Sequence, residues 1–129
     1  MSGSDLQNTD NQLQPILREL NNVSEHIEAS AIMSRDGLSV ASVLGDGVDP
    51  DRLGAMCAAL LGLADTTARE LNRGQLQQVL IHGSLGFMLI SHVGDKAVLA
   101  VATKPGTNLG MVFHETKKAA QKISDILYL

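Results

Sequence analysis

One helical stretch in the middle of the chain lacks the charged face that a surface helix normally carries. Asp49 and Pro50 mark its start, because an Asp side chain caps free N–H groups and Pro has no N–H to leave unpaired. Large apolar residues recur at three- and four-residue steps as far as Leu71, which predicts a helix over residues 50–71. No charged residue lies between Leu53 and Ala64. Both sides of this helix therefore need a cover.

The two sides of the predicted helix differ in residue size. The side expected to pack on a sheet contains Leu53, Met56, Cys57, Leu60, Ala64, Thr67 and Leu71. The second side contains Gly54, Ala55, Ala58, Ala59 and Gly62. Gly inside a helix costs about 1 kcal/mol relative to Ala, so we expect close backbone contact to offset that loss. The cover is either a second protein chain or, as the alternative, another part of the same domain.

The N-terminal part of the chain predicts a tail followed by a first helix. Residues 1–9 are polar and predict a flexible tail, and residues 10–129 predict a single domain. An apolar stripe from Leu13 to Ile27 has helical spacing. Because Pro15 is tolerated in the first turn of a helix, we expect this helix to begin within residues 11–14.

The remaining elements follow from apolar runs and turn residues. Asp36-Gly37 separates two short strands and is a strong hairpin signal, since Gly supplies the positive φ that a tight turn needs. Asn108 caps a last helix. The predicted strands are residues 29–34, 38–44, 76–82, 87–93 and 97–103. The element order is therefore α-β-β-α-β-β-β-α.

The strand over residues 76–82 is expected at an edge of the sheet. It contains no Lys, Pro or charged residue, although exposed edges are usually protected by such residues. We therefore expect it to pair with the same strand of a second copy across a two-fold axis.

Composition excludes several classes of function. The 129 residues include 10 basic and 14 acidic side chains, a net charge of −4 that disfavours nucleic-acid binding. The single cysteine, Cys57, allows no disulfide within the chain and no thiolate metal cluster. Residues 74–93 carry no charge, but glutamines and glycines interrupt them, so we expect two strands and no membrane insertion. With no secretion signal visible, we expect the reducing cytoplasm.

No arrangement of reactive side chains predicts catalysis, a cofactor or a metal. The histidines are His26, His82, His92 and His114. Those at 82 and 92 lie on neighbouring strands but not opposite each other, and no third ligand is close in sequence. Asp46, Asp49 and Asp51 lack the spacing of a calcium loop. Cys57 lies on the packing side of its helix, which indicates a buried, inert thiol.

Four segments, in this order and spacing, resemble the Roadblock (dynein light chain) domain family, and look closest to its prokaryotic, MglB-like branch. These segments are Met33 to Ala41, the small-residue helix Asp51 to Leu71, Gly86 to Ile90 followed by Gly94 to Ala100, and Asn108 to Val112. The resemblance extends from Leu13 to Leu127. It implies an α/β sandwich with a five-stranded, mostly antiparallel sheet. Two helices would cover one face and the middle helix the other.

The resemblance also implies a function. Members of this family are homodimeric scaffolds or regulators of small Ras-like GTPases without a nucleotide site of their own, and MglB-like dimers promote GTP hydrolysis in their partner. An alternative is an adaptor that tethers a motor or signalling kinase without affecting nucleotide turnover. A third is a small-molecule sensor, which an aliphatic core without convergent polar groups disfavours.

Residue-level expectations follow from these hypotheses. The predicted dimer interface comprises Gly54, Ala55, Ala58, Ala59, Gly62, Asp65, Thr66, Gln77, Val79 and Ile81. The candidate contacts to a GTPase are Arg52, Arg69 and Arg73, whose alternative role is that of solvated residues near the helix ends. None of the three is assigned as an arginine finger.

Overall fold

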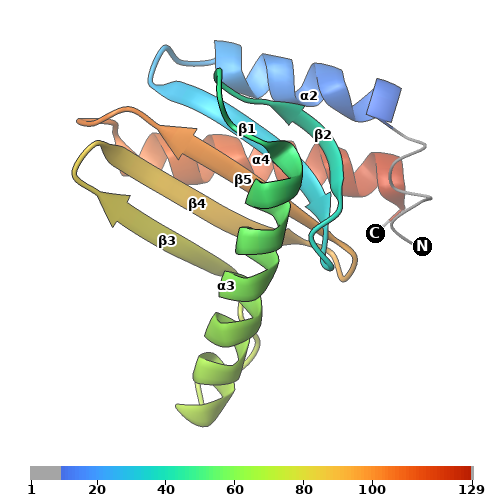
Figure 1. The fold of residues 1–129 in the computed structure, drawn as a ribbon, viewed down its shortest axis with the longest axis vertical. Helices are drawn as coiled ribbons and strands as arrows, with labels where there is room; N and C mark the ends of the chain where they lie inside the picture. The colour runs from blue at the N-terminus through green and yellow to red at the C-terminus, as the bar shows by residue number, and fades with distance from the viewer. Residues whose placement is uncertain (1–9, 129) are drawn as a thin grey trace.

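A computed structural model describes residues 10–128 of the chain as three helices and one five-stranded sheet. The elements, labelled as in Figure 1, are α2 (Asp10–Asn22), β1 (Ile27–Ser34), β2 (Ser39–Val43), α3 (Pro50–Glu70), β3 (Gln78–Gly83), β4 (Gly86–Val93), β5 (Ala97–Thr103) and α4 (Leu109–Leu127). The strand order is β2-β1-β5-β4-β3, and every neighbouring pair is antiparallel. The predicted element order and sandwich architecture are confirmed.

The sheet separates two apolar cores of unequal size. Alternate residues of β5 point to opposite faces, so Leu99 joins the core beneath α2 and α4, whereas Val98 joins the core beneath α3. Figure 1 shows α2 and α4 side by side behind the sheet and α3 in front of it. The larger core is filled by aliphatic side chains, including Leu13, Leu17 and Ile123.

Local sequence signals account for the starts of α3 and α4. The Asp49 carboxylate accepts a hydrogen bond from the backbone N–H of Asp51 at 3.0 Å, with Pro50 in the first position of α3. The side chain of Asn108 caps α4 in the same way, accepting from the N–H of Met111 at 3.1 Å. These are the two caps that the sequence predicts.

The first helix differs from its prediction at both ends. It begins at Asp10, one residue before the predicted window, so Pro15 is its sixth residue. It ends at Asn22, and the apolar stripe does not continue: Val23 is exposed and Ile27 opens β1, opposite Thr103 of β5. Pairing with the sheet therefore overrides the helical spacing at Ile27, and Val23 lies in the connection between α2 and β1. The predicted tail, residues 1–9, lies outside the described part of the chain.

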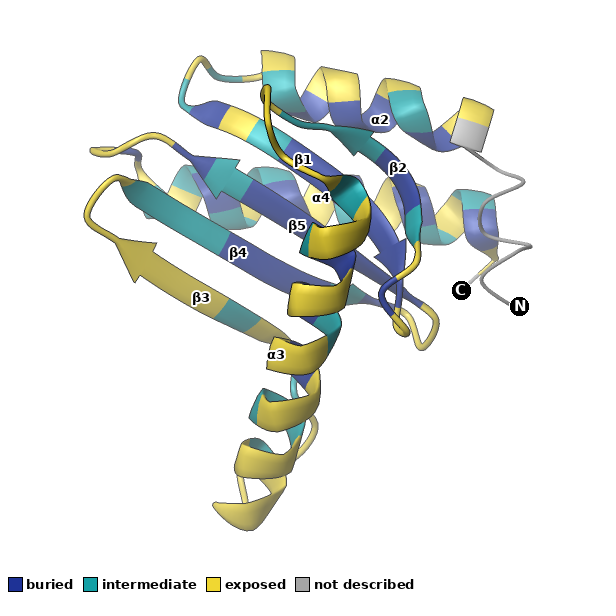
Figure 2. Cartoon of the chain, in the orientation of Figure 1, coloured by how far each residue is buried: buried dark blue, intermediate teal, exposed yellow. Residues whose placement is uncertain are grey.

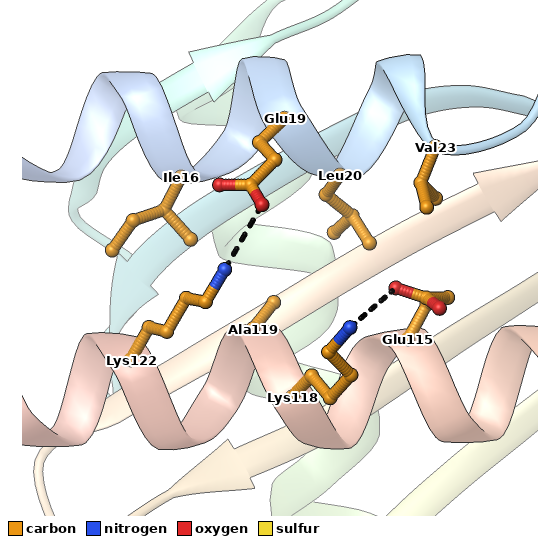
Figure 3. Close-up of a pocket in the computed structure, with 8 residues that line it drawn as sticks. All are labelled: Ile16, Glu19, Leu20, Val23, Glu115, Lys118, Ala119 and Lys122. Carbon is orange, nitrogen blue, oxygen red and sulfur yellow. Dashed lines mark hydrogen bonds and ion pairs between the residues drawn. The ribbon is translucent and has the colours of Figure 1, made fainter.

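Helices α2 and α4 pack together over the sheet through apolar and charged contacts. Ile16 and Leu20 of α2 face Ala119 of α4, and the ammonium group of Lys122 donates to the Glu19 carboxylate at 3.0 Å (Figure 3). This side of the domain thus has the apolar and charged faces of an ordinary surface helix pair.

Candidate protein-interaction surface

Helix α3 makes one close backbone contact with the β1–β2 hairpin. Gly54 of α3 lies against Gly37, the residue that turns the β1–β2 hairpin with φ of +91°. A Cβ on Gly37 would lie 2.8 Å from the carbonyl oxygen of Gly54, and a Cβ on Gly54 would collide with the carbonyl oxygen of Gly37. Only glycines allow this approach. It fixes the rotation of α3, which turns Cys57 and Leu61 toward the sheet.

This rotation corrects two predictions about the faces of α3. Met56, Leu60 and Leu71, expected to pack on the sheet, are 50%, 39% and 61% exposed, and Thr67, expected on the same side, is also exposed. Gly54, expected on the outward side, is buried within its own domain and is not available to a partner. When every residue along a helix is apolar or small, hydrophobic periodicity does not distinguish the inner face from the outer one.

The outer side of α3 is a continuous uncharged surface, which we call the α3 face. It consists of Ala55, Met56, Ala59, Leu60, Gly62 and Leu63, all of them exposed. Leu63 is 69% exposed and was not among the residues predicted for an interface. A helical projection centred on Cys57 and Leu61 would have placed it on the outer side. Exposed apolar patches of this kind mark interaction sites.

The α3 face continues onto the open edge of the sheet. Strand β3 forms that edge, and β4 is its only neighbour among the described residues. Val79 packs beneath α3, and by strand alternation Ile81 points to the same side. Figure 2 shows exposed residues along both the outer side of α3 and most of β3. The structure thus brings Ala55, Ala59 and Gly62 to the same side of the sheet as Val79 and Ile81.

The other residues predicted for the interface lie at its margins. Ala58 is half-buried beside Leu61 and Gly62. Asp65 forms an ion pair with Arg69 at 3.0 Å, and the hydroxyl of Thr66 donates to the carbonyl of Gly62 at 3.1 Å. The exposed Gln77 precedes β3, and its carbonyl accepts a hydrogen bond from the N–H of His92 at 3.2 Å.

The three arginines proposed as GTPase contacts do not form one cluster. Arg52 lies in the first turn of α3 and Arg69 in the last, a separation of about 25 Å at the rise of an α-helix. Arg73 follows the helix and donates through Nε to the carbonyl of Leu71 at 3.0 Å. Each is exposed, and Arg69 and Arg73 already have partners within the chain.

One histidine, His92, lies beneath α3, and its surroundings lower its pKa. His92 of β4 lines a small gap under α3 together with Arg35 and Asp65. Burial, followed by the positive charge of Arg35, lowers the pKa of His92, while Asp65 opposes this shift. Its Nδ1 atom is buried and has no hydrogen-bond partner among the described residues. The neutral imidazole is therefore the favoured form in the folded protein.

This shift predicts a loss of stability in mild acid. Below the ordinary histidine pKa of about 6.5, the unfolded chain binds a proton that folded His92 does not, so the free energy of unfolding falls. Above that pH, His92 contributes no pH dependence. We expect His92→Gln to lose less stability than wild type between about pH 7.5 and about pH 5.5 in urea unfolding. The exposed His114→Gln is the control, and equal losses in wild type and His92→Gln would contradict this account.

The described residues contain no candidate metal site, since no three His, Cys, Asp or Glu side chains converge. His26 lies in the turn after α2 and not on a helix, and His82 stacks on Phe87, its partner across the β3–β4 hairpin. Cys57 is buried, and burial raises the pKa of its thiol, which disfavours the reactive thiolate. Within residues 10–128, no helix has the length and apolar character to span a membrane.

The architecture and the α3 face together define an α/β sandwich whose open surface suits association with another protein. The chain belongs to the Roadblock/LC7 domain family, whose model matches residues 13–103. The uncharacterized proteins MJ1340 and MJ0310 of Methanocaldococcus jannaschii are each 40% identical to it over 108 residues, or 84% of this chain and 93% of theirs. The family resemblance inferred from sequence is confirmed.

Solved structures show the same fold. A Roadblock/LC7 domain from Streptomyces avermitilis superposes with a TM-score of 0.83 at 18% identity, over 90% of this chain and 98% of that one. MglB from Myxococcus xanthus gives a TM-score of 0.84 at 18% identity, over 91% and 95%. A further structure, described as MglB with a tetrameric arrangement, gives 0.80 at 18% identity, over 91% and 88%.

Proposed function

We propose that the protein is a non-enzymatic homodimer that regulates or scaffolds a small Ras-like GTPase. The observation that carries this proposal is the uncharged α3 face, which continues onto the open edge of β3. A two-fold axis beside β3 places two copies of this strand antiparallel and buries the two α3 faces against each other. The backbone groups on the edge of β3 then find partners, and one sheet runs through both copies.

Residue size on the α3 face also favours a second copy as its cover. A Cβ at Gly62 would meet no atom within 4 Å in the single chain, so nothing in the domain itself requires glycine there. A partner backbone that approaches Gly62 closely would require glycine at this position. The tetrameric arrangement described for an MglB of the same fold is consistent with self-association.

Dimerisation occupies the centre of the α3 face, so the GTPase contacts the surface around it. Arg52, Arg69 and Arg73 lie near the two ends of α3, and in a two-fold dimer each end is present twice. The dimer acts by positioning loops of its partner. In support, no three His, Cys, Asp or Glu side chains of the described residues converge as a metal site, and the three arginines do not form one cluster. Regulation through conformation requires that the dimer bind one state of the GTPase more tightly than another.

Single-turnover hydrolysis separates a regulator from an adaptor. The GTPase is first identified by affinity capture from the source cells, then loaded with GTP and followed with and without this protein. We expect faster hydrolysis with the wild-type dimer and no stimulation by a variant that stays monomeric. An unchanged rate with retained binding would favour an adaptor that tethers a motor or kinase, and absence of binding to any small GTPase would contradict the proposal.

The arginines are expected to contribute binding and not transition-state chemistry. An arginine finger is worth about 10³ to 10⁵ in turnover. Arg69 is held by Asp65 and Arg73 by the carbonyl of Leu71, which leaves neither extended toward a partner. We expect Arg52→Gln, Arg69→Gln and Arg73→Gln each to change the saturated hydrolysis rate by less than about ten-fold. A loss of about 10³-fold in one of them would assign a finger.

A further inference from the structure

A second site lies on the face of the sheet opposite α3. Ser91 of β4 and its cross-strand partner Gln78 of β3 point to the α4 side, because the alternating residue Ile90 packs beneath α3. There α4 leaves the edge of the sheet uncovered, and a cavity of about 560 Å³ remains between Phe113 and Thr116 of α4 and the start of β3. This volume is within the range of small-molecule sites.

One hydroxyl at this cavity has no partner. Thr116 is a buried residue with 3% of its surface exposed, and its Oγ1 makes no hydrogen bond within residues 10–128. Thr66 and Thr67 of α3, in contrast, donate to carbonyls four residues earlier at 3.1 and 2.9 Å. An unpaired buried hydroxyl is costly. Oγ1 is itself buried, so this hydroxyl reaches an occupant of the cavity through a change of χ1 rotamer, and Thr in a helix divides between two such rotamers.

One charged side chain, that of Lys117, lines the cavity. Lys117 is the only lining residue that is charged at neutral pH, and it has no ion pair among the described residues. The neighbouring lysines of α4 are paired: Lys118 with Glu115 at 3.9 Å and Lys122 with Glu19 at 3.0 Å, both toward α2 (Figure 3). An occupant therefore meets one uncompensated positive charge.

Apolar and amide groups, the hydroxyl of Ser91 and the imidazole of His92 complete the lining. The ring of Phe113 offers an apolar surface, and the side-chain amides of Gln75 and Gln78 offer donors and acceptors at the rim. We propose that this cavity binds a small organic anion with an apolar, ring-sized body, such as an aromatic carboxylate. Its anionic group pairs with Lys117, its body packs on Phe113, and the hydroxyl of Thr116 donates to it.

This proposal does not rest on the proposed function. The cavity and the α3 face lie on opposite sides of the sheet, and the lysine that selects the ligand belongs to α4. Gln77 lines the cavity and also belongs to the predicted dimer interface, so a second copy paired along β3 would border the cavity. The ligand site and the oligomeric state are therefore measured separately, and failure of ligand binding leaves the oligomeric state unaffected.

The test is a titration of the full chain with benzoate, followed by ¹H–¹⁵N NMR. We expect saturable shifts of the amide signals of Gln78, Ser91 and Thr116, and no shifts on the α3 face. Benzamide, the neutral isostere of benzoate, and inorganic phosphate, an anion without a ring, are expected to bind more weakly. No saturable shift with benzoate, or equal binding of benzamide, would overturn the proposal.

Matched lysine variants locate the charge. An exposed ion pair contributes at most about 1 kcal/mol, so Lys117→Gln is expected to weaken benzoate binding about three- to five-fold. Lys118→Gln, one residue away but directed toward Glu115, is expected to leave binding unchanged. Equal effects of the two variants would show that general attraction, and not this cavity, holds the anion. The spectra also report directly that each variant is folded.

Discussion

Gly62→Glu is expected to convert the dimer into monomers that keep the native fold. The single domain accommodates the new side chain, since a Cβ at Gly62 meets no atom within 4 Å. In the dimer the carboxylate would be buried against the partner without a compensating charge, at a cost of about 3–5 kcal/mol. This corresponds to a dissociation constant weakened by more than about 100-fold. Sedimentation velocity at micromolar concentration measures the loss, and circular dichroism reports the fold.

Two variants serve as controls for this expectation. Gln12→Glu places an equal charge on an exposed residue of α2, on the other side of the sheet from α3, and it is expected to remain dimeric. Gly62→Ala adds only a methyl group. In a helix facing water it would stabilise the protein by about 1 kcal/mol, whereas a closely packed partner backbone would turn this gain into weaker association. A stabilised Gly62→Ala with unchanged self-association would contradict close packing at this position.

Gly54→Ala is expected to produce a large loss of fold stability. Its Cβ would collide with the backbone carbonyl of Gly37, and backbone atoms on both sides cannot move aside as a flexible side chain can. Overpacking of this kind typically costs 1–3 kcal/mol, and we expect about 2–3 kcal/mol here. The measurement is the free energy of unfolding in urea, compared with wild type.

Gly45→Ala is the matched control for that variant. A Cβ at Gly45 meets nothing within 4 Å, and its φ is not positive. We therefore expect a small gain in stability, on the order of 0.4–1 kcal/mol, from the stiffer unfolded chain. If Gly54→Ala unfolded at the same urea concentration as wild type, α3 would not be seated on the β1–β2 hairpin as described.

Local chemistry explains which parts of the fold were predictable. The Asp49 and Asn108 caps and the hairpin at Gly37 depend on a few neighbouring residues, and the structure has all three as predicted. The end of the first helix depends on a distant partner. Ile27 leaves the helical stripe because β5 offers it a strand position opposite Thr103, and no local pattern carries that information.

The exposed, uncharged side of α3 was predictable in its location but not in its detail. Absence of charge between Leu53 and Ala64 predicted a helix without a charged outer face, and the structure has such a helix. The orientation of α3 could not be predicted from this pattern, because the contact that decides it joins Gly54 to a hairpin 17 residues earlier in the chain. The prediction therefore included a glycine that the domain itself covers, and omitted Leu63, the most exposed large residue of the α3 face.

The central claim is that α3 and β3 form an interface between two copies of this chain. Size-exclusion chromatography with light scattering, at micromolar concentrations of the wild-type protein, tests it most directly. The account predicts a mass twice that of the 13.7 kDa chain, retained on dilution through the micromolar range. A mass of 13.7 kDa throughout that range would contradict it.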